Sequence, residues 1–411
     1  MKGSTFAQTP SPITLRNCFE KALEVSERVA IQESQIRAAE AKYGQALAAI
    51  LPNVHFIATE FLQDDSAQQL GAGQIGTTLT RFSTPTAKLN AKQPLFNGLR
   101  EYYALSVVHS QKRQNKAEWE NAKRKLFVDV ANAFYTVIQL EKDLELAKAI
   151  TKTLKRRLKE SITRMDLGKA RASEKMNTES ELAIAEAAAS ETEGGLAAAK
   201  EVLAFFIGPY NAPLLDDVEI PSAPKEEDFV LKSDENRPDI VAAKEAAFSS
   251  RQKLKIEKGA FFPTINAEAN YYAYRVGFQK DIKWDALFTL DFSIFEGGKT
   301  RAKIQEAKIL LKQAELELDE KRRNANLEIK KAYEAFTHGQ KQSEAFKIAE
   351  TKGEENYRVS LKDYQLGLIN NLELLEVLRS LQNVRRTYNR VWLQTKMDYL
   401  NLKAKAGKPL L

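Results

Sequence analysis

The sequence has few of the residues that catalytic and metal sites use. Its 411 residues include one cysteine, Cys18, and three histidines, His55, His109 and His338. A single cysteine cannot form an internal disulfide, and histidines this far apart make no pair of metal ligands at helical spacing. The sequence therefore predicts no disulfide, no metal site and no cofactor site.

Proline is absent from two long spans, between Pro94 and Pro209 and between Pro263 and Pro409. Proline breaks helix interiors and central strands, so spans without it are free to be helical or extended throughout. Long apolar runs are also lacking. Because no stretch of about 18 apolar residues occurs, the sequence predicts no transmembrane helix.

A concentrated basic surface is also missing, although the formal net charge is +7. Glutamate and lysine alternate along the helical spans, and the short basic runs at 155–160 and 320–325 are typical of solvated helix faces. Nucleic-acid binding requires a basic face with aromatic platforms. The sequence therefore predicts no nucleic-acid partner.

One short stretch, SIFEGGKT at 293–300, ends like a nucleotide-binding P-loop. That motif needs a glycine five positions before Gly298, because backbone amides there must wrap the phosphates closely. Ser293 occupies that position. A nucleotide-hydrolysing enzyme is therefore a weak alternative, and without paired catalytic carboxylates or a Ser/His arrangement we predict that the chain is not an enzyme.

The most informative feature of the sequence is an internal duplication. Three landmarks recur 199 positions apart (295 − 96), and a proline recurs 211 positions apart (263 − 52), so a loop between proline and phenylalanine absorbs the difference. We predict a first repeat at 13–208, a linker or equatorial segment at 209–235, and a second repeat at 236–407. The landmark pairs are Phe96 and Phe295, Gly168 and Gly367, Gly208 and Gly407, and Pro52 and Pro263.

Each repeat is predicted to contain a helix, a β-hairpin, a very long helix, a Leu-Gly turn and a further helix. The hairpins fall at about 53–96 and 264–295, and the turns at 167–168 and 366–367. The first long helix, from about Arg100 to Met165, would be on the order of 100 Å long. Its apolar residues follow a coiled-coil spacing: Val130, Phe134, Val137, Leu144, Ala147, Thr151, Leu158, Ile162 and Met165.

The predicted strands alternate between apolar and polar residues. In 285–295 the apolar face carries Ala286, Phe288 and Leu290. Strands of about ten residues with one apolar face fit a membrane β-barrel with a wet lumen, and a soluble sheet packed on a core is the alternative. Open edges are not tolerated in lipid, so four strands would have to oligomerise. The polar faces would line the lumen with residues such as Lys88, Lys92, Glu268 and Asp291.

This duplicated plan resembles the TolC-like bacterial outer-membrane efflux family over nearly the whole chain. The resemblance implies a mostly α fold with four β-strands per protomer, and a trimer that combines a twelve-stranded β-barrel with an α-barrel of long helices. Besides the two Leu-Gly turns, it is carried by the residues at the strand–helix junctions: Pro52, Phe96, Gly98, Pro263, Phe295 and Gly297.

The same resemblance implies where a partner would bind. In the family the two helix-connecting turns meet a periplasmic adaptor, also called a membrane fusion protein. A glycine between helices is also an ordinary C-terminal cap, and the two roles are compatible. The matching adaptor-docking tips are Leu167, Gly168 and Lys169 in the first repeat and Leu366, Gly367 and Leu368 in the second.

A pore constriction is implied just after the second tip. Glu373 and Glu376 match an acidic pair that rings the entrance of the family's channels, although such a pair is also typical of a solvated helix face. Tyr364 and Glu174 match members of the network that holds the entrance closed. Ile369 stands where the family has an arginine, so that network cannot be copied intact.

The resemblance therefore implies a passive exit duct of a tripartite efflux or type I secretion system. Its partners would be two further copies of the chain, the adaptor, an inner-membrane pump and outer-membrane lipid. Its strands would lie in the bacterial outer membrane and its helices in the periplasm. The alternative is a soluble, elongated coiled-coil scaffold, which leaves the ten-residue strands unexplained.

Overall fold

The computed structural model describes residues 12–63, 82–168, 170–221, 225–230, 237–277 and 279–410. The chain divides into two compact units. Unit 1 combines Met1–Gln32, Glu118–Val241 and Lys321–Leu411, and unit 2 combines Glu33–Ala117 and Ala242–Glu320. Residues 64–81, in the middle of the hairpin predicted at about 53–96, lie outside the described residues. Among the residues described, no helix carries an apolar stretch long enough to cross a bilayer.

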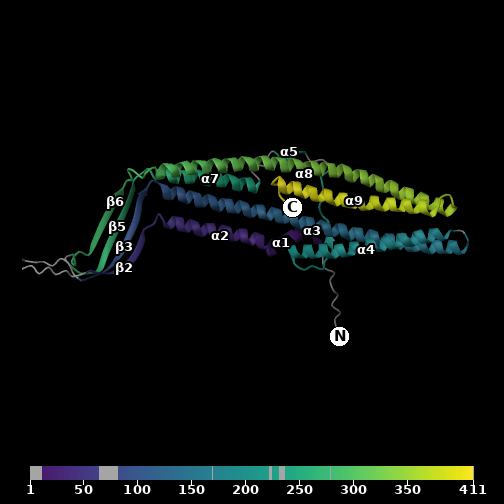
Figure 1. Cartoon of the computed structure of the whole chain (residues 1–411), viewed down its shortest axis with the longest axis horizontal. Coiled ribbons are helices and arrows are strands. Elements are labelled where there is room, and N and C mark those ends of the chain that lie inside the picture. The colour runs from purple at the N-terminus through teal and green to yellow at the C-terminus, as the bar shows by residue number, and fades with distance from the viewer. Residues whose placement is uncertain are drawn as a thin grey trace, which may run out of the picture. The chain divides into compact units, whose positions relative to one another are not determined.

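Two very long helices contribute residues to both units. α3 spans Arg100–Asp166 and α8 spans Lys299–Leu366, with 67 and 68 residues. In unit 1, α4 (Ala172–Ile207) lies alongside α3, and α9 (Asn371–Lys405) lies alongside α8 (Figure 1). The shorter helices are α1 (Leu15–Val25), α2 (Glu27–Ala48), α5 (Glu227–Val230) and α7 (Pro238–Gly259). The long helices follow from the lack of proline, as predicted.

The core of unit 1 is built on the middle of α3. Phe127, Phe134 and Tyr135 are fully buried there, and they belong to one cluster with Leu203 of α4 and Leu393 of α9. Cys18 of α1 lies in the same cluster, where burial raises the pKa of its thiol to about 12 despite the nearby Lys21. A thiol that stays protonated in an apolar core acts as a small packing residue.

The predicted apolar seam of α3 is confirmed from Val130 to Ala147 but is only partly buried beyond Thr151, where Leu158 and Met165 are half-buried. Toward the end of the helix Leu154, Arg157 and Ser161 are buried instead, and Ile162 is exposed. The spacing pattern could not reveal this change, because it depends on which neighbouring helix supplies the partner surface.

The predicted linker holds regular structure that sequence patterns did not indicate. β4 (Leu214–Leu215) pairs in parallel with β1 (Ile13–Thr14), and Phe229 of α5 is buried against Phe336 of α8 and Leu402 of α9. Two-residue strands have no detectable alternation, so tertiary pairing alone defines them.

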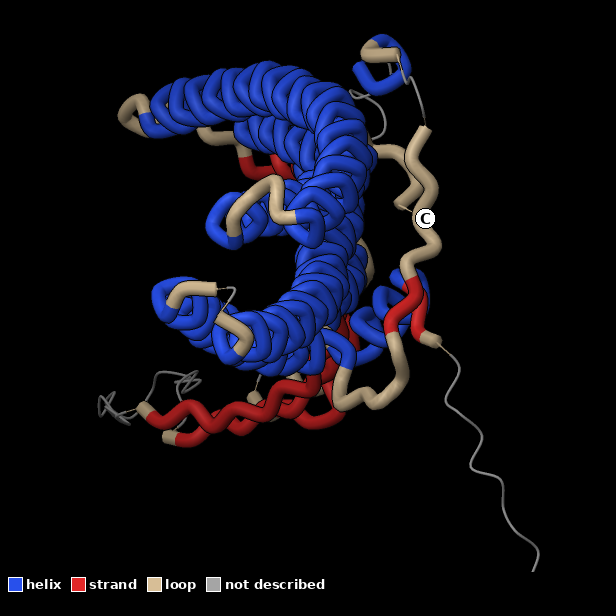
Figure 2. The backbone as a smooth tube through the Cα atoms, turned by 90° about the vertical axis from the view of Figure 1, so that its right-hand side faces the viewer, coloured by secondary structure: helices blue, strands red, loops and turns tan. Residues whose placement is uncertain are grey.

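Unit 2 is organised around a four-stranded antiparallel sheet in the order β2-β3-β5-β6 (Figure 1). Figure 2 draws its strands in red. Its strands are β2 (Asn53–Leu62), β3 (Ser83–Asn97), β5 (Thr264–Arg275) and β6 (Trp284–Asp291). β6 ends four residues before the predicted end at 295. Asp291 pairs with Thr264, the first residue of β5, and Pro263 before it has no N–H to extend the ladder.

Candidate functional site

The sheet of unit 2 has its apolar face exposed and part of its polar face buried. Phe288 and Leu290 on β6 are 71% and 66% exposed, whereas Asn90 on β3 and Asn270 on β5 are 7% and 8% exposed. The opposite distribution is expected of a sheet that covers a soluble core. This arrangement instead fits a sheet whose apolar face meets lipid.

A polar ladder crosses three strands on the other face. The Asn90 amide donates to Glu268 Oε1 at 2.7 Å and to Asn270 Oδ1 at 2.8 Å. Asn270 in turn donates to Asp285 Oδ1 at 2.8 Å, and the Tyr272 hydroxyl donates to Asp285 Oδ2 at 2.8 Å. The alternation predicted this polar face, but it could not reveal which side chains bond to one another.

The predicted strand–helix junctions lie where the strands begin and end. Pro52 and Pro263 directly precede β2 and β5. Phe96 is near the end of β3, Gly98 lies between β3 and α3, and Phe295 and Gly297 lie in the loop between β6 and α8. Thr300, in the first turn of α8, donates to Glu296 in that loop. SIFEGGKT is therefore part of the connection from strand to helix.

The predicted tips are the turns that join α3 to α4 and α8 to α9. Gly168 and Gly367 adopt positive φ of 71° and 78°, and Leu167, Leu366 and Leu368 are exposed. Exposed apolar side chains therefore lie at both helix turns. Lys169 lies outside the described residues.

The predicted acidic pair lies on the first turns of α9, and both of its side chains are exposed. Glu373 takes part in a capping box: its backbone N–H donates to Asn370 Oδ1 at 3.0 Å, and its carboxylate accepts from the Asn370 backbone N–H at 3.3 Å. This box stabilises the start of α9 and fixes the Glu373 side chain. The structure gives Glu376 no corresponding local bond among the described residues.

Tyr364 and Glu174 belong to contacts between helices in unit 1. The Tyr364 ring is buried, with the guanidinium groups of Arg164 and Arg157 at 4.7 Å and 5.4 Å from its centroid. The backbone carbonyl of Glu174 accepts from the buried Asn371 amide at 3.5 Å, and Asn371 also donates to Thr178 Oγ1 at 3.0 Å. The stacking arginines and the Asn371 bond were missed by sequence reasoning, because polar residues on a helix carry no signal of their partner.

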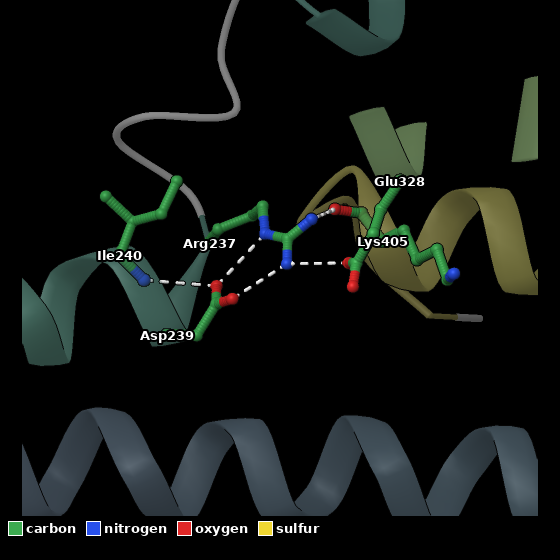
Figure 3. A network of polar contacts seen from close by, with 5 residues as sticks. All are labelled: Arg237, Asp239, Ile240, Glu328 and Lys405. Atoms are coloured by element: carbon green, nitrogen blue, oxygen red, sulfur yellow. Dashed lines mark hydrogen bonds and ion pairs between the residues drawn. The ribbon is translucent and has the colours of Figure 1, made fainter. Parts of the chain in front are cut away.

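A second network missed from the sequence holds the start of α7 (Figure 3). Arg237 donates to both carboxylate oxygens of Asp239 at 3.0 and 2.7 Å, to Glu328 Oε2 at 3.1 Å and to the Lys405 carbonyl at 3.2 Å. Burial alone would raise the pKa of Asp239, but the bonds and charge of Arg237 hold that pKa below its ordinary value of 3.8.

No metal centre is evident in the part of the chain that the structure describes: no three histidine, cysteine, aspartate or glutamate side chains lie close enough to hold an ion. The geometry instead presents an exposed apolar sheet face, two apolar tips and an acidic pair on α9, shortly after the second tip in the chain. These are features of surfaces that meet lipid, partners or solutes.

Comparisons with known proteins agree with these features. The family model described as "Outer membrane efflux protein" matches residues 19–209 and 232–408. The cation efflux system protein CusC of Escherichia coli K12 is 23% identical over 220 residues, which is 48% of this chain and 45% of that protein. The aligned part thus spans about half the length of the curated relatives.

Solved structures share the fold over nearly the whole chain. A crystal structure of CusC superposes with a TM-score of 0.83 at 17% identity, covering 96% of this chain and 92% of the other. VceC of Vibrio cholerae gives a TM-score of 0.82 at 18% identity, covering 97% of both chains. The chain therefore belongs to the outer membrane efflux protein family: its location is the bacterial outer membrane, and its family is one of channels rather than of soluble coiled-coil scaffolds or enzymes.

Proposed function

We propose that the chain is the passive exit duct of a tripartite efflux or type I secretion system. It performs no chemistry, and solutes leave the periplasm through it while an inner-membrane pump supplies the energy. The observation that carries this proposal is the sheet whose apolar face is exposed and whose polar face holds the Asn90–Asn270–Asp285 ladder. Such a sheet is stable when lipid covers its apolar face and its polar face lines a wet lumen.

The duct is a homotrimer in this proposal. β2 and β6 are the end strands of the sheet, and an unpaired strand edge in hydrocarbon costs several kcal/mol for each unsatisfied backbone group, as an order of magnitude. Pairing β6 of one copy with β2 of the next satisfies both edges. Three copies then give the twelve strands of the barrel in the resemblance described above.

The acidic pair forms the pore constriction in this assembly. A threefold axis would bring together three copies of Glu373 and three of Glu376, which focuses negative potential on solutes that enter. Tyr364 and Glu174 hold the surrounding helices. Ile369 stands where the family has an arginine. Instead, the stacking of Arg157 and Arg164 on Tyr364 secures α8 against α3.

The two tips dock the periplasmic adaptor. Exposed Leu167, Leu366 and Leu368 offer apolar anchors, and the turns at Gly168 and Gly367 present them beyond the helix ends. In the second repeat the docking tip and the constriction are neighbours in the chain, because Leu366–Leu368 lie just before α9 with its acidic pair. Docking at this tip therefore acts directly on the constriction.

Crosslinking in detergent tests the assembly. The full chain should fractionate with outer membranes and yield a crosslinked species of three subunits. A protein that stays monomeric and does not associate with membranes would overturn the proposal.

Conductance in planar bilayers tests the constriction. Glu373→Gln with Glu376→Gln should reduce cation selectivity, and Glu344→Gln with Glu355→Gln on α8 removes equal charge as the matched control. Equal loss of selectivity in both variants would show that the pair forms no constriction.

A further inference from the structure

A cationic cleft of unit 1 has no role in the duct as described. The cleft has a volume of about 470 Å³ and lies where α3, α8 and α9 meet the start of α7. This volume is within the usual range of small-molecule sites. The cationic side chains that line it are Arg28, Arg124, Lys125, Arg237, Lys321 and Lys405.

The carboxylates of the cleft are already paired. Asp239 and Glu328 accept hydrogen bonds from Arg237, and Asp129 lies 3.9 Å from Arg28. Among the residues that the structure describes, Arg124, Lys125, Lys321 and Lys405 have no carboxylate within 4 Å. Figure 3 shows the Lys405 ammonium directed away from the Arg237 network, although its backbone carbonyl belongs to it.

Arg124 is the most constrained of these cations. Its Nη1 donates to the Lys408 carbonyl at 2.8 Å and its Nη2 to the Gly407 carbonyl at 3.0 Å. A guanidinium has five N–H donors, and Arg124 Nε is buried without a partner in the described structure. Burial lowers the pKa of Arg124, and the charge of Arg237 lowers it further against the opposing effect of Glu120. This cation therefore lacks a full counter-charge.

Helix capping explains only part of the cluster. Cations collect at helix C-termini because the last carbonyls carry partial negative charge. Arg237 bonds the carbonyl of Lys405, the last residue of α9, and fits this role, whereas Arg124 bonds the Gly407 and Lys408 carbonyls just after the helix. Lys125 on α3 and Lys321 on α8 bond no carbonyl of α9 in the described structure, so capping gives no reason for their presence.

We propose that the cleft binds a small oxyanion, a ligand bearing phosphate or carboxylate groups, between Arg124, Lys125, Lys321 and Lys405. Charge-assisted bonds to such oxygens are the strongest that these side chains form, and a multivalent anion satisfies several at once. Unlike the constriction, which needs three copies of the chain, this site is lined by residues of a single chain. It is therefore independent of the proposed duct.

Isothermal calorimetry on the full chain in detergent tests the site. Inorganic phosphate and citrate serve as separate probes against chloride at matched ionic strength, and they distinguish a phosphate ligand from a carboxylate ligand. Lys125→Gln with Lys321→Gln should weaken binding of the preferred probe about tenfold, because two of four cations are lost.

The matched control is Lys253→Gln with Lys308→Gln, which removes the same charge from exposed positions of unit 2. Its affinity should equal that of the wild type. Absence of binding by both probes, or equal weakening in the control, would overturn the proposal.

A further variant asks whether the chain supplies its own anion. Asp234 and Glu235 precede Arg237 in sequence but lie outside the described residues. Asp234→Asn with Glu235→Gln should bind the probe as the wild type does. Binding that appears only in this variant would show that an internal carboxylate fills the cleft and that no external ligand is bound.

Discussion

The two exits from the sheet into the long helices share the letters Phe-x-Gly but differ in packing. At the first exit Gly98 has a φ of 62°, and a Cβ there would lie 2.1 Å from the Gly259 carbonyl oxygen at the end of α7. At the second exit Gly297 has a φ of 61°, and apart from its chain neighbours no described residue has an atom within 4 Å of the position of its Cβ. Equal backbone angles thus occur in unequal surroundings.

This difference shows that repeating a sequence motif does not repeat its contacts. The first exit is completed within unit 2 by the end of α7, whereas Ile294 and Phe295 at the second exit are 90% and 88% exposed. Two adjacent exposed apolar side chains are typical of a surface that another molecule covers. In the proposed trimer a neighbouring copy or lipid provides it.

The largest effect is expected from a methyl group at the first exit. Gly98→Ala combines the strain of a positive φ with a backbone clash that cannot relax by rotating a side chain, so it should destabilise the protein by about 4 kcal/mol or more. Urea unfolding followed by tryptophan fluorescence in lipid vesicles measures it.

Gly297→Ala is the matched control at the second exit. This substitution introduces the strain of the positive φ without the backbone clash, so it should lower the free energy of unfolding by only about 1 to 2 kcal/mol. Equal losses in the two variants would mean that the contact with Gly259 contributes nothing and that the exits are equivalent.

A smaller effect is expected from a substitution in β6, the strand that precedes the second exit. Phe288 and Thr289 are neighbours on opposite faces of the sheet. Phe288→Arg places a charge on the proposed lipid face and should cost about 2 to 4 kcal/mol, whereas Thr289→Arg faces the lumen and should cost much less. The same vesicle assay compares them, and a larger loss for Thr289→Arg would reverse the assignment of faces.

The next effect concerns the start of α7, the helix that leads into the sheet strands of the second repeat. α7 begins at Pro238, 211 positions after the start of α2 at Glu27 (238 − 27), and Arg237 with Asp239 stabilises this start. Asp239→Asn should cost about 1 to 2 kcal/mol at pH 7 because it weakens charge-assisted bonds.

The pH dependence of this loss gives a second readout. The pKa of Asp239 is held below 3.8, so its stabilisation is complete above the unfolded pKa and is lost as pH falls through the lower folded pKa. The difference between the unfolding midpoints of wild type and variant should therefore narrow as the pH falls from 7 to 3. A gap that widens toward low pH would contradict the assigned network.

The smallest effect is expected at the start of α2, the corresponding helix of the first repeat. There Ser26 Oγ accepts from the Val29 backbone N–H at 3.4 Å, a long bond in place of the arginine network. Ser26→Ala should cost about 0.5 to 1 kcal/mol with no acid dependence. The same titration checks this, and a loss as large as that of Asp239→Asn would mean that the two starts are held equally.

Much of the architecture could be predicted because local patterns set it. Proline-free spans predicted α3 and α8, and alternation predicted the exposed row through Phe288 and Leu290. The early end of β6, the arginines on Tyr364 and the pair of β1 with β4 could not be predicted. Each depends on a partner that is distant in sequence.

The helix lengths and the faces of the strands can be read from the amino-acid sequence, because they follow from chain stereochemistry and the spacing of apolar residues. The folded chain is needed to see that Gly98 is packed while Gly297 is free, and that Arg124 bonds the carbonyls just after α9 in the same cleft as Lys125 and Lys321. The reason is physical. Periodicity records which way a side chain points along its own element, whereas contacts and counter-charges depend on the neighbour that it meets.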